Sequence, residues 1–161
     1  MLLQKQINIR KAEITDLEKI THLFRETVLH INSKDYSQSQ VEIWSSGADN
    51  TEKWKQRIEQ QYFILAQMEN QIVGFASISP DGYLDVFYVH KDFQKQGVAK
   101  ALLKEIEKQA KIQKNKEITS EISITALPFF EKNGFKVVKE QRKELKGTIF
   151  INYLMVKYKS D

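Results

Sequence analysis

The chain has 161 residues, of which 41% are hydrophobic and 29% charged, and its formal net charge is +4. This length fits one domain over residues 1–161, and so small a basic excess does not indicate nucleic-acid binding. Because cysteine is absent, disulfides, thiolate metal sites and cysteine nucleophiles are excluded.

Membrane and metal sites are not expected either. No run of residues approaches the roughly 20 apolar residues that span a bilayer. Residues 1–10 lack the pattern of a signal peptide, so we expect a cytoplasmic protein. The three histidines, His22, His30 and His90, show no spacing suited to metal ligation.

The N-terminal third is predicted to be mainly helical, after a short strand at residues 7–10. Thr15 and Glu18 form a capping-box pattern, and the residues after them carry an apolar stripe at helical spacing. Ser37 and Gln40 repeat the capping pattern before a second short helix. Trp54 and Ile58, four residues apart, mark a third helical region.

The remainder mixes strands with helices. Three consecutive strands are predicted at 62–66, 72–78 and 83–90, with turns between them. The elements after these strands are a helix at 97–114, a strand at 118–122, a helix at 125–133 ended by Gly134, and a hairpin that begins at 135 and turns near Lys146 and Gly147. This order predicts an α+β (mixed α/β) fold and not a parallel βαβ array.

The most informative segment is the loop between the third strand and the long helix, Phe-Gln-Lys-Gln-Gly-Val-Ala-Lys at residues 93–100. The first turn of a helix leaves backbone N–H groups unpaired, and the helix dipole adds positive potential there. Gly97 allows the backbone to approach an anion closely, and Lys95 and Lys100 add charge at the rim. The loop therefore predicts a site for phosphate or pyrophosphate.

The pattern Gln94-x-x-Gly97-x-Ala99, between a strand and a helix, resembles the acyl-CoA loop of the GNAT superfamily of N-acetyltransferases. Residues 126–135, Ala-Leu-Pro-Phe-Phe-Glu-Lys-Asn-Gly-Phe, resemble the second signature of that family. Order and spacing of the two signatures also fit, and the resemblance covers nearly the whole chain.

The resemblance implies a mostly antiparallel central sheet, flanked by helices and splayed between the fourth and fifth strands, with acetyl-CoA in the gap. Pyrophosphate would lie on the backbone N–H groups of 96–100, and pantetheine would pair with the backbone of 87–89 as an added strand does. The expected cofactor contacts are Phe87, Tyr88, Val89, Gln94, Lys95, Gln96, Gly97, Val98, Ala99, Lys100, Ser123, Phe129 and Phe130. For Ser123, satisfaction of the local backbone is an equally good interpretation.

Acetyl transfer by direct attack of an amine on a thioester needs a base and donors to the oxyanion. Asp85 is the best base candidate, because it interrupts an apolar strand, and alternation places it on the face of Phe87 and Val89. A structural carboxylate paired with lysine or backbone is the alternative, and Glu121 is a weaker rival. Backbone N–H groups near Val89 are expected to supply the oxyanion donor.

The family's usual acid is a tyrosine at the position of Phe130, which has no proton to give. Either the thiolate leaves unaided, or another hydroxyl, such as that of Tyr88 or Ser123, reaches the sulfur. On the acceptor side, which the N-terminal helices form in this superfamily, the candidate residues are Phe24, His30, Tyr36 and Trp44.

These observations predict an acetyltransferase that uses acetyl-CoA and acts on an amine of a small molecule or a peptide. Two alternatives stay open: a non-catalytic acyl-CoA-binding sensor and a protein-interaction module. No metal, nucleic acid or membrane is expected as a partner, and the resemblance is compatible with a homodimer.

Overall fold

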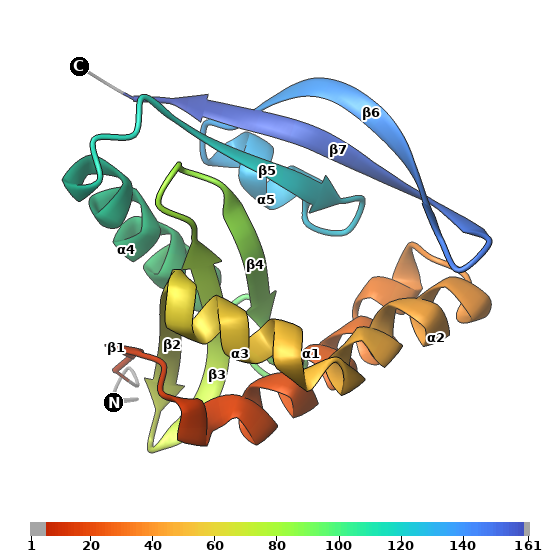
Figure 1. The fold of residues 1–161 in the computed structure, drawn as a ribbon, viewed down its shortest axis with the longest axis horizontal. Helices are drawn as coiled ribbons and strands as arrows, with labels where there is room; N and C mark the ends of the chain where they lie inside the picture. Colours follow the sequence, from red (N-terminus) through yellow and green to blue (C-terminus); the bar gives the residue numbers. More distant parts are fainter. Residues whose placement is uncertain (1–5, 160–161) are drawn as a thin grey trace, which may run out of the picture.

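The computed structural model describes residues 6–159, so the expectation for residues 1–5 lies outside the described part of the chain. Two antiparallel sheets form the frame (Figure 1). The first has the order β1-β2-β3-β4, with β1 Asn8–Lys11, β2 Tyr62–Met68, β3 Gln71–Ile78 and β4 Leu84–Val89. The second has the order β5-β7-β6, with β5 Glu117–Ser123, β6 Lys136–Leu145 and β7 Thr148–Tyr158.

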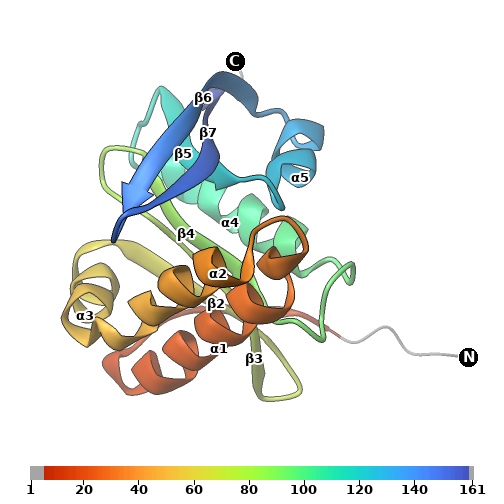
Figure 2. The same cartoon turned by 90° about the vertical axis from the view of Figure 1, so that its right-hand side faces the viewer.

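Helices lie against both faces of the four-stranded sheet (Figures 1 and 2). They are α1 Leu17–His30, α2 Gln38–Ser45, α3 Thr51–Gln60 and α4 Val98–Ile112, while α5 Leu127–Lys132 lies beside the three-stranded sheet. Within the described part of the chain, no helix has the length and apolar character needed to cross a membrane. The structure thus confirms the α+β fold and the splayed, mostly antiparallel sheet.

Side chains alternate across the first sheet, so two separate apolar cores form. On one face, Leu102 and Ile106 of α4 pack over the sheet and are fully buried. On the other face, Val28 of α1 and Trp54 of α3 pack against Phe75 of β3. Helix α4 therefore covers one face and helices α1–α3 cover the other.

The helix starts show one confirmed cap and one correction. At α2, Ser37 Oγ accepts from Gln40 N–H at 3.2 Å, and Gln40 Oε1 accepts from Ser37 N–H at 2.7 Å, as the capping box predicts. At α1, the prediction of Thr15 as the cap was wrong. A 3-10 turn at Ile14–Asp16 precedes the helix, and Asp16 Oδ2 accepts from Glu13 N–H at 2.8 Å.

Two turns agree with the sequence prediction. Gly134 has φ of +92° at the end of α5, a conformation that favours glycine. Lys146 and Gly147, with φ of +50° and +78°, form the two-residue turn that joins β6 to β7.

Candidate active site

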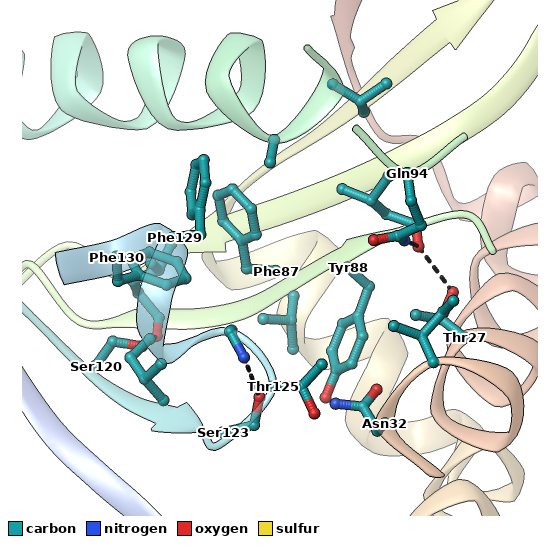
Figure 3. Close-up of a pocket in the computed structure, with 18 of the residues that line it drawn as sticks. Thr27, Asn32, Phe87, Tyr88, Gln94, Ser120, Ser123, Thr125, Phe129 and Phe130 are labelled. Atoms are coloured by element: carbon teal, nitrogen blue, oxygen red, sulfur yellow. Dashed lines mark hydrogen bonds between the residues drawn. The ribbon is translucent and has the colours of Figure 1, made fainter. Parts of the chain in front are cut away.

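The candidate site lies where β4 and β5 separate. The two strands belong to different sheets but touch near their N-terminal ends, where Thr119 N–H donates to Gly82 O at 3.1 Å and Ser120 Oγ donates to Leu84 O at 2.7 Å. Beyond these contacts they separate, and a cavity of about 470 Å³ occupies the gap. The parting of the sheets thus creates the site (Figure 3).

The edge of β4 that faces this cavity has free backbone groups. His90 N–H donates to Val73 O at 2.8 Å, and hydrogen-bonded pairs alternate along an antiparallel ladder. Tyr88, in register with Phe75, therefore directs its backbone groups toward β3. Phe87 and Val89 direct theirs toward the open side. Of the three residues expected to pair with pantetheine, Phe87 has both backbone groups available, Val89 has its N–H, and Tyr88 has neither.

The carbonyl oxygen of Val89 accepts two hydrogen bonds from different elements. Gln94 Nε2 donates to it at 2.8 Å from the loop after β4, and Thr27 Oγ1 donates at 3.0 Å from α1 (Figure 3). Gln94 Nε2 also approaches His90 O at 3.3 Å. The signature glutamine therefore fixes the loop to the end of β4.

The loop ends at α4, whose first residue is Val98. Gly97 has φ of +87°, and a Cβ added there would meet only Ile7 Cδ1, at 4.0 Å. Its backbone conformation, and not lack of space, is what requires glycine. The N–H groups of residues 98–100 precede the first intrahelical donor, Ala101, which bonds Gly97 O at 3.0 Å. They remain available to an anion.

The cavity wall contains nearly all the loop residues expected to contact the cofactor: Gln94, Lys95, Gly97, Val98, Ala99 and Lys100. Gln96 is the exception. Its side chain turns back and donates to Asp92 O at 3.4 Å. Any contact of Gln96 with the cofactor would thus be made by its backbone.

Phe87, Phe129 and Phe130 form an aromatic wall beside the loop (Figure 3). The Phe130 ring lies 5.2 Å from each of the other two rings and 5.1 Å from that of Phe135. Phe130 is only 1% exposed. At the position where the resembled family carries a tyrosine, this chain therefore has a core residue.

Ser123, at the end of β5, serves the local backbone. Its Oγ accepts from Ala126 N–H at 3.1 Å, which fits the structural interpretation of this residue. The side chain also lines the cavity, so the expected cofactor contact remains open to it.

Asp85 lines the cavity but faces a different way from the prediction. In the β3–β4 register Ile78 pairs with Leu84 and Ser77 with Val86, so a bulge leaves Asp85 without a partner. Its Oδ2 accepts from Arg57 Nε and Gln61 Nε2, both at 2.9 Å, at the C-terminal end of α3. The predicted placement on the face of Phe87 and Val89 was wrong, because the bulge interrupts the alternation.

Tyr88 presents its side chain to the same cavity from the face of α1 and α2. Its ring lies 5.0 Å from that of Phe24 and 5.6 Å from that of Phe75, and its hydroxyl accepts from Trp44 Nε1 at 3.3 Å. Burial raises the pKa of Tyr88 to about 12, against the opposing effects of the Trp44 hydrogen bond and the Arg57 charge. The phenol therefore keeps its proton at neutral pH and is a donor.

Of the four residues expected on the acceptor side, only Trp44 lines the cavity. Phe24 is buried in the second core. Tyr36 is also buried, where its hydroxyl donates to Ile151 O at 2.7 Å and accepts from Ile124 N–H at 3.0 Å. His30 is exposed on α1, with Nδ1 2.9 Å from Glu26 O. These three residues support or flank the site without lining it.

Four polar wall residues were not among the predicted site residues: Thr27, Asn32, Ser120 and Thr125. Thr27 interrupts the apolar stripe of α1 between Phe24 and Ile31, which was a usable signal. Asn32 follows the end of that helix, where asparagine is common as a C-terminal cap. The residue type therefore did not indicate a role in a site.

Comparison with known proteins agrees with this geometry. The model of the acetyltransferase (GNAT) domain family matches residues 32–157. An uncharacterized N-acetyltransferase of Escherichia coli K12, YafP, is 35% identical over 149 residues, which is 92% of this chain and 94% of that protein. The chain belongs to the GNAT acetyltransferase family.

Solved structures show the same fold. A GCN5-related N-acetyltransferase from Rhodopseudomonas palustris superposes with a TM-score of 0.91 at 28% identity, covering 98% of this chain and 99% of the other. The PaiA N-acetyltransferase from Thermoplasma acidophilum, solved with coenzyme A, has a TM-score of 0.79 at 25% identity, covering 96% and 99%.

Proposed function

We propose that this protein transfers an acetyl group from acetyl-CoA to an amine acceptor by direct attack of the amine on the thioester. The observation that carries the proposal is the cavity between β4 and β5, with the free backbone groups of Phe87, the free N–H of Val89 and unpaired N–H groups at the start of α4. Acetyl-CoA, when bound, supplies the activated acetyl group.

The residues present fit such a cofactor. The N–H groups of 98–100, with the dipole of the 15-residue helix α4, suit the pyrophosphate. Lys95 and Lys100 add charge at the same end of the cavity. Phe87 and Phe129 offer an apolar surface to the chain of the pantetheine, and the free backbone groups of β4 suit its amides.

Each catalytic role has a residue on the cavity wall. Asp85 accepts the proton of the attacking amine as the new C–N bond forms. The N–H of Val89, which points away from β3, stabilises the negative charge that develops on the carbonyl oxygen. As the C–S bond breaks, Tyr88 gives its proton to the departing thiolate.

The test combines binding with turnover. Calorimetry should show binding of acetyl-CoA by the full chain, and a thiol assay should show release of free coenzyme A in the presence of an amine panel. Binding without amine-dependent release would make the protein an acyl-CoA-binding protein. If acetyl-CoA does not bind, the proposed function is refuted.

A further inference from the structure

The cavity has a second end, on the face of β4 that α1 and α2 cover. Its wall there includes Asn32, Trp44, Tyr88 and Thr125. The cations on the cavity wall, Lys95 and Lys100, both lie at the opposite end, on the cofactor loop and the first turn of α4.

The carboxylates of this wall already have cationic partners. Asp85 bonds Arg57, and Glu121 lies 3.5 Å from Lys143. Among the described residues, this end therefore has no unpaired cation to bind an acceptor's carboxylate. It also has no unpaired carboxylate to bind a second ammonium group. The second end is suited to neutral groups.

Three polar groups at this end have unused hydrogen-bonding capacity. Asn32 is 6% exposed, and its side-chain amide has no hydrogen bond to any described residue. Thr125 Oγ1 is buried and has no partner within residues 6–159. The Tyr88 hydroxyl accepts from Trp44, but its own proton has no acceptor in the described part of the chain.

Figure 3 shows these three side chains directed toward the same part of the cavity. A buried polar group without a partner lowers the stability of the fold, and such groups are rare in native proteins. Thr125 Oγ1 is such a group. The Asn32 amide and the Tyr88 proton beside it also have no partner among the described residues, which indicates that a ligand completes hydrogen bonds in this space. Asn32 and Thr125 together offer two N–H donors, one O–H donor and the acceptor oxygen of the amide, while the Tyr88 proton serves the thiolate.

We propose that Asn32 and Thr125, beside Tyr88, hold an uncharged oxygen group of the acceptor, an amide carbonyl or a hydroxyl, next to its reacting amine. This rests on the proposed acetyl transfer and specifies its acceptor class. The acceptor is an amine with a neighbouring amide or hydroxyl. A free amino acid, which brings a carboxylate, and a polyamine, which brings a second ammonium group, are both poorer acceptors.

The first experiment measures kcat/KM for five amines that share one carbon skeleton: alaninamide, 2-amino-1-propanol, alanine, 1,2-diaminopropane and isopropylamine. These amines differ in basicity, and this difference affects the wild type and Asn32→Leu equally. The ratio of kcat/KM values for two amines is therefore compared between the two proteins. The wild type should prefer alaninamide or the amino alcohol over isopropylamine by about tenfold more than the variant does, for one to two neutral hydrogen bonds.

Equal preferences in the two proteins overturn the proposal, as does a wild type that favours alanine or the diamine. A panel with no turnover at all also counts against it. Acetyl-CoA affinity is measured in parallel. If the cofactor binds and other amines are acetylated while the preference is absent, the acceptor assignment fails and the proposed function stands.

The second experiment uses stability, which does not depend on finding the acceptor. Asn32→Leu and Thr125→Val keep the size of the side chain and remove the unpaired group, so both variants should melt at or above the wild-type temperature. The matched control is Asn50→Leu. Asn50 Oδ1 caps α3 by accepting from Lys53 N–H, so this variant should melt lower.

A lower melting temperature for both Asn32→Leu and Thr125→Val would mean that these groups have structural partners, and the proposal would fail. Asn32→Asp adds a charge at constant shape. It should raise the ratio of kcat/KM for 1,2-diaminopropane to that for alaninamide at least about tenfold, because the new carboxylate attracts the second ammonium group. An unchanged ratio would place Asn32 outside the acceptor site.

Discussion

The guanidinium of Arg57 donates from Nε to Oδ2 of Asp85 at 2.9 Å, and the two side chains are 15% and 20% exposed. Gln61 donates to the same oxygen, so Oδ2 is occupied by two donors. Oδ1 has no hydrogen bond within the described residues and lies on the side chain that lines the cavity. One oxygen orients the carboxylate, and the other is available to an amine proton.

This arrangement predicts the effect of Asp85→Asn. The amide keeps the shape of the side chain and loses its basicity, so single-turnover acetylation should slow by about 10²–10⁴-fold. Acetyl-CoA affinity should stay within twofold of the wild type (about 0.4 kcal/mol). Glu121→Gln is the matched control and should keep most of the activity. Full activity of Asp85→Asn with loss of activity in Glu121→Gln would exchange the two roles.

Gly97→Asp should weaken acetyl-CoA binding at least about tenfold, or 1.4 kcal/mol, because it places a negative charge at the anion site of α4. The matched control is Gly147→Asp. Gly147 also has a positive φ, and a Cβ there meets nothing within 4 Å in the β6–β7 turn. Both variants carry the backbone cost of a side chain in this conformation, about 1 kcal/mol. Calorimetry should find weaker binding of acetyl-CoA in Gly97→Asp and unchanged binding in Gly147→Asp.

Tyr36→Phe should destabilise the fold by about 1–3 kcal/mol, because the lost hydroxyl leaves Ile151 O and Ile124 N–H without this partner. Urea unfolding measures the change. Tyr153→Phe removes a hydroxyl whose contact with Glu140 Oε1 is long, 3.4 Å, and exposed, so it should cost less than about 0.5 kcal/mol. An equal loss in the free energy of unfolding for both variants would show that the hydrogen bonds of the Tyr36 hydroxyl do not stabilise the fold.

Alkaline pH should destabilise the protein mainly through the two tyrosines whose pKa values are raised most, Tyr83 and Tyr88, since burial also raises the pKa of Tyr36 and Tyr62. Burial raises the pKa of both Tyr83 and Tyr88 to about 12, above the value of 10.0 expected in an unfolded chain. Between these pH values the unfolded state releases protons that the folded state keeps. The contribution of the two tyrosines to the free energy of unfolding is therefore fully present below pH 10 and is lost as the pH rises toward 12. Each tyrosine contributes at most about 1.4 kcal/mol per pH unit.

Urea unfolding between pH 8 and 11 measures this slope in the wild type and in Tyr83→Phe, which retains one of the two groups. The variant should lose less stability over the same interval. A flat profile in the wild type would contradict the proposed burial of both phenols.

The parts of the site that the sequence predicted are those set by local pattern. The cofactor loop could be predicted because a strand, Gly97 and a helix start are contiguous in the chain. The position of Asp85 could not, because a bulge in the β3–β4 pairing reverses the face, and pairing joins residues distant in sequence.

The acceptor side was harder to predict for a similar reason. Phe24 and Trp44 are both aromatic residues of N-terminal helices, yet one is core and the other lines the cavity. Composition does not separate these outcomes, since packing between helices decides them. Asn32 became visible only when the structure showed a buried amide with no partner.

The carbonyl of Val89 joins the two regions to which the proposed function assigns acetyl-CoA and the acceptor. Gln94 belongs to the cofactor loop, and Thr27 belongs to the helix beside the acceptor end, so both sets of ligand contacts act on one backbone oxygen. Thermodynamic linkage then requires reciprocity: whatever factor acetyl-CoA applies to acceptor affinity, the acceptor applies to acetyl-CoA affinity. We therefore expect a substitution of Thr27 to change the affinity for acetyl-CoA, through the carbonyl oxygen that Thr27 and Gln94 share.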